Sequence, residues 1–430
     1  MPNILQPDCE ETPVWRSQAV NRLLVLAIVL VLLSVAPPVK AQTFKVLYDF
    51  TNGTDGGVAN TTLVRDPAGN LYGTTEEGGD INSSNCNPPQ GCGTIFKIDT
   101  HGKETVLYDF ENSPDAAFPS AGLVRDQKGN LYGTTFLGGT SNNGAIFRLG
   151  TTGKETVLYS FTGGRDGGDP MASLILDSNG NLYGTTYTGG DLSCRVGEMN
   201  GCGVVFKLSK AGKLTVLHRF HGTDGADPLA GVVRDEAGNL YGTTTAGGSA
   251  TCNGGCGTVF KLNQAGKETV LHTFTLGDGA TPMRGSLIRD RAGNLYGTTQ
   301  WGGDLSCGGG GIGCGTVFKL DKTGKETVLY KFKLGTDGGL PAGGLVRDPA
   351  GNFYGTTSLG GQLSCNGGDG CGTVFKLDKA GKETALYDFT NGSDGAFPEA
   401  TLVRDPFGNL YGTTEGNLQN TWGSVFEVIP

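Results

Sequence analysis

Apolar and polar residues alternate in short runs along this chain, and the runs follow one another in a fixed order. β-Branched and aromatic residues fill the runs, and Gly, Pro, Asn and Asp fill the turns between them. Within residues 343–389 the runs are Gly344–Asp348, Phe353–Thr357, Thr373–Leu377 and Glu383–Phe389. A long Gly-rich loop separates the second run from the third. The pattern predicts a four-stranded antiparallel meander and contains no helical period.

The same order of strands recurs seven times. Its marker is Gly-Asn-Leu-Tyr-Gly-Thr-Thr, with Phe in place of Leu in one copy. The copies span residues 69–75, 129–135, 180–186, 238–244, 293–299, 351–357 and 408–414. A spacing of 51 to 60 residues is typical of repeat proteins, whose units bury a core only by packing on their neighbours.

The two ends of the repeat region complement each other. Phe44–Phe50 matches a fourth strand with no first three before it, and Ser424–Ile429 matches a third strand with no fourth after it. Pairing these two segments would complete the last unit and protect its edges. We therefore predict an all-β fold: a seven-bladed β-propeller of four-stranded antiparallel blades, closed by that pairing, as a single domain over residues 42–430.

Residues 1–41 follow a different pattern. Arg16 and Arg22 precede the apolar run Leu23–Leu33, and small residues flank Lys40 at the predicted cleavage site after Ala41. We interpret this segment as a secretory signal peptide. The alternative is an uncleaved membrane anchor, for which the run is short. The mature chain is then expected to be secreted, periplasmic or on the cell surface, with no membrane span.

Cysteine usage agrees with export. Cys9 lies in the leader, and the other ten cysteines form five close pairs in the long loops: Cys86/Cys92, Cys194/Cys202, Cys252/Cys256, Cys307/Cys314 and Cys365/Cys371. In an oxidising compartment such pairs are expected to form local disulfides. The alternatives are free thiols or zinc, and zinc would need pairs from different repeats to converge.

Charge and motifs argue against several function classes. The chain has 33 basic and 42 acidic residues, a net charge of −9, and no basic run, which disfavours a nucleic-acid partner. It has no phosphate loop, dinucleotide fingerprint or His-rich zinc motif. His218 and His221 are close in sequence but lie on and just after an outer strand, where we interpret them as exposed polar residues. We therefore predict no catalytic residues, no metal site and no cofactor, and we expect a monomer.

The long loops and the interblade connections share one face of the predicted ring, which is our candidate binding face. Each connection carries one aspartate, usually followed by Gly. A ring of these carboxylates could hold Ca²⁺ or a polyhydroxylated ligand. The alternative, which we favour, is that the aspartate makes the same turn seven times. The residues are Asp55, Asp115, Asp166, Asp224, Asp278, Asp337 and Asp394.

Aromatic residues begin three of the long loops. Phe136 and Tyr187 directly follow the Thr-Thr pair, and Trp301 follows it after Gln300. Sugar rings present C–H faces that pack on such side chains, so these three are candidate ligand-binding residues. The competing interpretation is that the rings cover the Gly-rich loops.

The full repeat resembles a known family. The pattern Gly-Gly-Leu-Val-Arg-Asp-x-x-Gly-Asn-Leu-Tyr-Gly-Thr-Thr-x-x-Gly-Gly, followed by Gly-Thr-Val-Phe-Lys-Leu-x-x-x-Gly-Lys-Glu-Thr-Val-Leu-Tyr-x-Phe, is similar to the GloVer tandem repeat of bacterial choice-of-anchor surface proteins. The resemblance covers Phe44 to Ile429. It implies an exported, propeller-like repeat protein held by different anchors in different members, and it brings no catalytic residues with it.

These observations together predict a non-enzymatic binding or surface-interaction module, with a glycan, another cell-envelope polymer or a surface protein as its partner. Two alternatives stay open. One is a metal-dependent hydrolase or lyase on the long-loop face, and the other is a scaffold without a small ligand.

Overall fold

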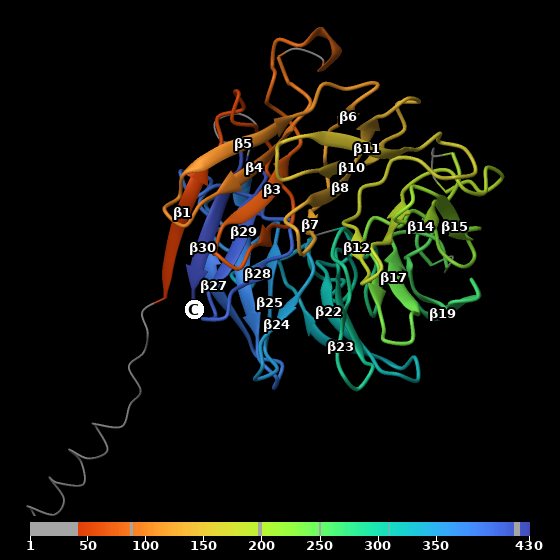
Figure 1. Cartoon of the computed structure of the whole chain (residues 1–430). Coiled ribbons are helices and arrows are strands. Elements are labelled where there is room, and N and C mark those ends of the chain that lie inside the picture. The colour runs from red at the N-terminus through yellow and green to blue at the C-terminus, as the bar shows by residue number, and fades with distance from the viewer. Residues whose placement is uncertain (1–41, 87–88, 197–199, 249–250, 309, 417–421) are drawn as a thin grey trace, which may run out of the picture. The chain divides into compact units, whose positions relative to one another are not determined.

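The computed structural model describes residues 42–86, 89–196, 200–248, 251–308, 310–416 and 422–430. The predicted signal peptide, residues 1–41, lies outside the described residues. The described chain forms seven four-stranded antiparallel sheets arranged in a ring, which is a seven-bladed β-propeller as predicted (Figure 1). Apart from the 3-10 helices η1 (Ser84–Cys86) and η2 (Asn366–Gly368), this part of the chain contains strands, turns and loops.

Each blade takes its strands in chain order. Blade 1 is β2-β3-β4-β5, blade 2 is β7-β8-β10-β11, blade 3 is β12-β13-β14-β15, blade 4 is β16-β17-β18-β19, blade 5 is β20-β21-β22-β23, blade 6 is β24-β25-β26-β27 and blade 7 is β28-β29-β30-β1. In Figure 1 the fourth strands β1, β5, β11, β15 and β23 lie around the outside, and the first strands β7, β12 and β24 lie nearer the middle.

The first strands are only two residues long, shorter than the sequence indicates: β2 (Val64–Arg65), β7 (Val124–Arg125), β12 (Ile175–Leu176), β16 (Val233–Arg234), β20 (Ile288–Arg289), β24 (Val346–Arg347) and β28 (Val403–Arg404). The segments that lead into them converge on one another. A Cβ at Gly122 would lie 2.6 Å from the carbonyl oxygen of Thr62 and 3.0 Å from Oγ of Ser173, in the two neighbouring blades. This crowding leaves room only for very small residues at that position.

The second strands carry the Leu-Tyr-Gly-Thr-Thr marker: β3 (Leu71–Thr75), β8 (Leu131–Thr135), β13 (Leu182–Thr186), β17 (Leu240–Thr244), β21 (Leu295–Thr299), β25 (Phe353–Thr357) and β29 (Leu410–Thr414). The glycine in the middle of the marker has a packing reason. A Cβ at Gly73 would lie 2.6 Å from the ring of Phe96 on the next strand and 2.9 Å from Leu63. Any larger residue would push this phenylalanine out of the core.

The third and fourth strands complete each blade. The third strands are β4 (Thr94–Ile98), β10 (Ala145–Leu149), β14 (Val204–Leu208), β18 (Thr258–Leu262), β22 (Thr316–Leu320), β26 (Thr373–Leu377) and β30 (Ser424–Ile429). The fourth strands are β1 (Thr43–Asp49), β5 (Glu104–Asp109), β11 (Glu155–Ser160), β15 (Leu214–Arg219), β19 (Glu268–Thr273), β23 (Glu326–Lys331) and β27 (Glu383–Asp388). A short extra ladder joins β6 (Ala116–Ala117) to β9 (Leu137–Gly138).

The ring closes by the predicted pairing. β1 runs antiparallel to β30, with Thr43 opposite Ile429 and Asp49 opposite Ser424. The ring of Phe44 stacks on Tyr387 of blade 6 at a centroid distance of 3.6 Å. The N-terminal strand therefore completes blade 7 and also packs on the blade before it.

Phenylalanine pairs form the core between blades. The residue after each fourth strand packs edge-on against the phenylalanine of the next blade's third strand. Phe110 meets Phe147 at 5.2 Å between blades 1 and 2, and Phe389 meets Phe426 at 5.2 Å between blades 6 and 7. Such aromatic pairs add to the stabilisation from burial itself. All seven junctions carry this pair, so the interblade core is regular around the ring.

A polar cluster holds each first hairpin. The carboxylate of Asp66 accepts hydrogen bonds from the backbone N–H of Asn70 at 2.9 Å, from its Nδ2 at 2.8 Å and from the Tyr72 hydroxyl at 3.1 Å. Burial alone would raise the pKa of Asp66, but these hydrogen bonds outweigh it and hold the pKa below its usual value. Asp, Asn and Tyr thus recur together because they form one cluster.

Candidate functional site

The aspartates of the interblade connections lie in turns that they hold together. The carboxylate of Asp115 accepts hydrogen bonds from the Tyr108 hydroxyl at 2.9 Å and from the backbone N–H of Glu111 at 3.0 Å. Asp55, Asp166, Asp337 and Asp394 accept the same pair of hydrogen bonds from a fourth-strand tyrosine and from the backbone. These contacts account for the sevenfold recurrence of the aspartate, and a ligand role for the ring stays a prediction.

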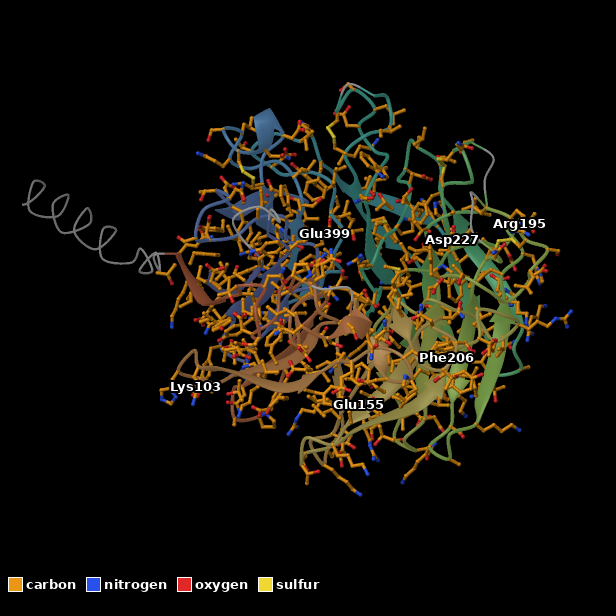
Figure 2. The ribbon with its side chains drawn as sticks, turned by 90° about the horizontal axis from the view of Figure 1, so that it is seen from above. Lys103, Glu155, Arg195, Phe206, Asp227 and Glu399 are labelled. Carbon is orange, nitrogen blue, oxygen red and sulfur yellow. A yellow bond between two sulfur atoms is a disulfide. The ribbon has the colours of Figure 1, made fainter. Side chains whose placement is uncertain are left out.

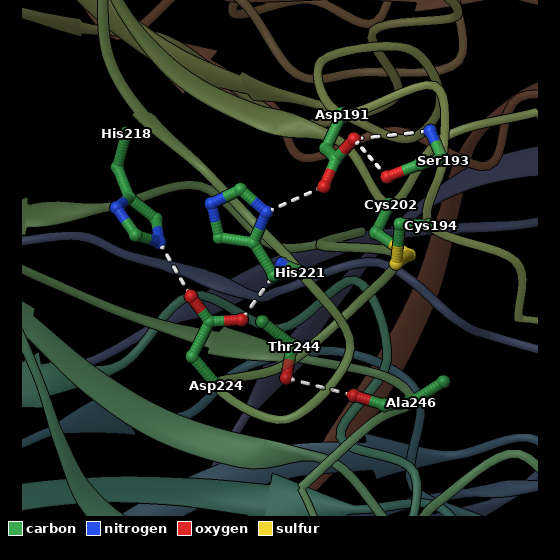
Figure 3. The surroundings of a disulfide bond; sticks show 9 residues. All are labelled: Asp191, Ser193, Cys194, Cys202, His218, His221, Asp224, Thr244 and Ala246. Carbon is green, nitrogen blue, oxygen red and sulfur yellow. Dashed lines mark hydrogen bonds and ion pairs between the residues drawn. A yellow bond between two sulfur atoms is a disulfide. The ribbon is translucent and has the colours of Figure 1, made fainter.

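Two histidines replace that tyrosine. His218 Nε2 lies 3.0 Å from the carboxylate of Asp224, and His272 Nε2 lies 3.2 Å from that of Asp278. Beside the Cys194–Cys202 disulfide, His221 Nδ1 lies 2.6 Å from Asp191 in the long loop of blade 3 (Figure 3). His218 is therefore largely buried, contrary to our expectation of an exposed residue, because it takes over the structural contact of the tyrosine.

All five predicted cysteine pairs are disulfides: Cys86–Cys92, Cys194–Cys202, Cys252–Cys256, Cys307–Cys314 and Cys365–Cys371. Most of these sulfurs are buried against the interblade core. Across the described part of the chain, no group of three or more His, Cys, Asp or Glu side chains is arranged to hold a metal ion.

The structure separates the three candidate aromatic residues. The backbone N–H groups of Phe136 and Tyr187 bond to the carbonyls of Phe118 and Asp169 in the interblade connections, at 2.9 and 3.2 Å. Trp301 lies one residue further along its loop, where it forms a bridge with Ala280 and packs on the core between blades 4 and 5. Phe136 and Tyr187 thus share a position that Trp301 does not.

That position recurs in all seven blades. The residue after each Thr-Thr pair donates its N–H to the carbonyl of a residue with left-handed backbone in the interblade connection. The residues after Thr-Thr are Glu76, Phe136, Tyr187, Thr245, Gln300, Ser358 and Glu415, and their partners are Val58, Phe118, Asp169, Asp227, Thr281, Leu340 and Phe397. The residues that directly follow these partners in the interblade connections surround the axis of the ring. We call this end of the axis the mouth.

A small cavity lies at the mouth. Its volume is about 20 Å³, and its lining comes from the connections that lead into blades 1, 2, 3, 5 and 7. The polar residues that line it include Asn60, Ser120, Arg284 and Glu399. In the top view of Figure 2, Glu399 lies near the middle of the ring, whereas Lys103, on a hairpin, lies at the periphery.

Charged residues interrupt the repeat here. Counted back from the Asp that follows the first strand, Arg284 and Glu399 occupy the same repeat position, which the other blades fill with Asn60, Ser120, Met171, Leu229 and Ala342. Glu76 and Glu415 are the two acidic residues among the seven that follow Thr-Thr. We call Asn60, Glu76, Ser120, Arg284, Glu399 and Glu415 the mouth cluster.

Contacts within the mouth cluster join distant blades. Arg284 NH1 lies 3.7 Å from Oε1 of Glu76, with about a quarter of each side chain exposed. Nδ2 of Asn60 donates a 3.1 Å hydrogen bond to Oε2 of Glu399. Burial raises the pKa of Glu76 despite the nearby Arg284. Burial, reinforced by the charges of Glu399 and Glu76, raises the pKa of Glu415 to about 7.

Hydrogen bonds from threonine hydroxyls link neighbouring blades around the ring, and one of these bonds is missing beside the connection that carries Arg284. In six blades the first Thr of the Thr-Thr pair donates its hydroxyl to a carbonyl of the next blade, as from Thr74 to Ala121 at 3.2 Å and from Thr413 to Thr61 at 3.1 Å. The seventh, Thr243, precedes the connection that carries Arg284, and its buried hydroxyl has no partner among the described residues. Asn60 Oδ1, Glu76 Oε1 and Arg284 NH1 are likewise buried and without a hydrogen-bond partner there.

The mouth cluster can therefore offer hydrogen bonds that the protein does not itself complete, in a setting with more negative than positive charge. Sequence reasoning missed it because its members come from separate repeats and none forms a local motif. The available indication was the aligned repeat position Asn60, Ser120, Met171, Leu229, Arg284, Ala342, Glu399, in which two residues of opposite charge stand among uncharged ones.

Solved structures with a similar fold include a streptogramin B lyase, 12% identical, with a TM-score of 0.56, covering 90% of this chain and 97% of that one. An extracellular domain assigned to a one-component system of B. thetaiotaomicron is 11% identical, with a TM-score of 0.51, covering 89% of this chain and 39% of that one. A gluconolactonase from Xanthomonas campestris is 17% identical, with a TM-score of 0.42, covering 75% and 88%. For the lyase and the extracellular domain, the likeness at these identities concerns the fold alone.

A comparison with curated proteins found no match. Within the described residues, no helix has the length and apolar character needed to cross a membrane. The repeat profile described as the Gloeobacter/Verrucomicrobia repeat matches residues 34–196, 84–310 and 305–430, which together take in nearly the whole chain. The protein belongs to the Gloeobacter/Verrucomicrobia repeat family.

Proposed function

We propose that this protein is an exported, non-enzymatic binding module that holds a polar group of a saccharide or another cell-envelope polymer at the mouth. One observation carries the proposal: Asn60, Glu76, Thr243 and Arg284 each hold a buried polar atom without a hydrogen-bond partner among the described residues, at the place where the repeat is interrupted.

In the other blades the segment from the left-handed residue to the core residue before the first strand is one residue shorter, as from Phe118 to Leu123, and the Thr hydrogen bond forms. The longer segment from Thr281 to Leu287 places Arg284 at the mouth. An arginine there is unfavourable for the fold, since a buried charge with incomplete partners is costly.

A pure scaffold gains nothing from a buried arginine that is unfavourable for the fold, whereas a ligand site can use its unpaired polar groups. Residues that do not suit the local structure occur most often at functional sites. Phe136 and Tyr187, which flank the mouth cluster on neighbouring blades, could pack against the faces of a sugar ring. The aspartate ring, Trp301 and Ca²⁺ remain part of the prediction, but the proposal does not depend on them.

Export is part of the proposal. Five disulfides are typical of an oxidising environment outside the cytoplasm or in the periplasm. We propose that residues 1–41 are the signal peptide that takes the chain there. N-terminal sequencing of the exported protein should begin at Gln42, and an intact Met1 would contradict this.

An enzyme at the same face is the competing function, and one observation favours it. The pKa of Glu415, raised to about 7 by burial and neighbouring carboxylates, suits a general acid or base near neutral pH. If the protein turns over a bound saccharide and the Glu415→Gln variant does not, the protein is an enzyme and the binding-module proposal is wrong.

The proposal is tested by screening residues 42–430 on a glycan array, with and without EDTA. We expect binding that Asn60→Ala and Glu399→Gln abolish and that Lys103→Ala, a change on a peripheral hairpin, leaves intact. An array without any bound saccharide would overturn the proposal. Binding that both mouth variants retain would place the site elsewhere and contradict it as well.

A further inference from the structure

We propose that the group received by the mouth cavity is a primary ammonium, so that the ligand is an amino sugar or another amine-bearing polymer. This inference rests on the proposed function, because it specifies what the same site binds. Size at the mouth limits the group to one as small as a hydroxyl or an amino group, and hydrogen-bonding capacity and charge favour the ammonium.

The cavity admits only a small group. A volume of about 20 Å³ is close to the minimum that holds a single water molecule. A sugar ring cannot enter it, but a substituent of the size of water can. The ring itself would then remain outside, against residues such as Phe136 and Tyr187. The cavity therefore selects among hydroxyl and amino substituents and not among whole rings.

Three groups of the lining can accept a hydrogen bond, whereas the unpaired donor of the lining, on the guanidinium of Arg284, lies against Glu76. Asn60 is 5% exposed, lines the cavity, and uses its Nδ2 to bond Glu399, which leaves its buried Oδ1 without a partner. The carboxylate of Glu399 and the hydroxyl of Ser120 line the same space and can accept further hydrogen bonds. An ammonium has three N–H donors and no acceptor, so it can address all three oxygens at once.

The charges of the mouth cluster also favour an ammonium. The mouth cluster holds three carboxyl groups, from Glu76, Glu399 and Glu415, against one guanidinium, from Arg284. Arg284 faces Glu76 at 3.7 Å and its charge also acts on Glu415, whereas Glu399 has no ion pair among the described residues. A hydroxyl would satisfy hydrogen bonds without reducing this charge, and an anionic group would increase it. An ammonium reduces it while making charge-assisted hydrogen bonds.

The experiment compares three ligands that differ at one substituent: the methyl glycosides of glucosamine, N-acetylglucosamine and glucose. Each is titrated calorimetrically into residues 42–430 at pH 6.5. We expect the glucosamine derivative to bind at least tenfold more tightly than the other two. Because each ligand carries at most one charge, non-specific attraction to the acidic chain stays small. Ammonium chloride should compete with the glucosamine derivative, whereas equal concentrations of sodium chloride should not.

Variants locate the contact. Glu399→Gln and Asn60→Ala should each weaken the glucosamine derivative at least tenfold, and Glu104→Gln, the same change on the outer strand β5, should not. Equal binding of all three glycosides would overturn the ammonium inference but leave the proposed function standing. Displacement of the glucosamine derivative by Ca²⁺ at equimolar concentration would overturn the inference in favour of a metal site. If no glycoside binds and the array is also empty, the proposed function itself fails.

Discussion

Asn60 and Glu399 are separated by 339 positions in the sequence, yet a 3.1 Å hydrogen bond joins their side chains at the mouth of the ring. Asn60 lies in the connection that enters blade 1, and Glu399 lies in the connection that enters blade 7. Closure of the ring by β1 is therefore what brings the two residues together. The architecture and the candidate site depend on the same junction.

Removing β1 should open the ring. Deletion of residues 43–50 removes the pairing with β30 and the stacking of Phe44 on Tyr387, and it exposes an edge strand in blade 7. We expect the midpoint of urea unfolding to fall sharply and the chain to self-associate, as followed by circular dichroism and light scattering. The milder change Phe44→Ala should cost about 2 to 3 kcal/mol, since it leaves the backbone pairing intact. An unchanged midpoint for the deletion would contradict closure by this strand.

Arg284 and Glu76 should be energetically coupled. Arg284→Ala leaves the partly buried carboxyl of Glu76 without its cation, and blade 6 carries Ala342 at the equivalent position, so the backbone tolerates the change. The double variant with Glu76→Gln should be more stable than the sum of the single effects predicts, with a coupling of about 1 kcal/mol. Urea unfolding of the four proteins measures it. Additive effects would show that the two residues do not interact.

Stability should fall as pH rises through the neutral range. Burial, followed by the charge of a nearby aspartate, raises the pKa values of Glu155 and Glu383 on the outer strands from 4.5 to about 7. Between these values the folded chain binds protons that the unfolded chain has released, so the free energy of unfolding decreases with increasing pH. The melting temperature should be higher at pH 5 than at pH 8.

Glu155→Gln should reduce that difference. Blade 3 carries Leu214 at the equivalent position, so the fold does not need the carboxyl group. The hairpin aspartates act in a lower range, because the pKa of a residue such as Asp126 lies below its usual value, and their contribution is lost only in stronger acid. Melting temperatures that rise from pH 5 to pH 8 would be incompatible with the buried outer glutamates.

The disulfides should contribute modestly and separately. Each closes a loop between cysteines only four to eight residues apart. In the chain-entropy view, such a loop contributes about 2 kcal/mol. Replacing Cys252 and Cys256 together by Ala should lower the free energy of unfolding by about that amount and leave the blade count unchanged, as judged by unfolding and small-angle scattering. If loss of this one disulfide unfolded the whole ring, the disulfide would not act locally and the prediction would be wrong.

The fold could be predicted from the sequence because its determinants are local and repeated. The marker from Gly69 to Thr75 specifies a hairpin and a strand, and the unmatched strands at the two ends imply closure. The mouth cluster could not be predicted in the same way. Arg284 and Glu76 form no motif within their own repeats, and only the ring brings them within 3.7 Å. The need for small residues before the first strands, such as Gly122, is likewise evident only from the way neighbouring blades pack against them.

The most direct test of the account is a crystal structure of residues 42–430 soaked with the methyl glycoside of glucosamine. We expect electron density for the amino group in the cavity, within hydrogen-bonding distance of Asn60 and Glu399, with the sugar ring outside it. Density only on the tight-hairpin face, only beside Trp301, or nowhere on the ring would contradict the mouth as the ligand site.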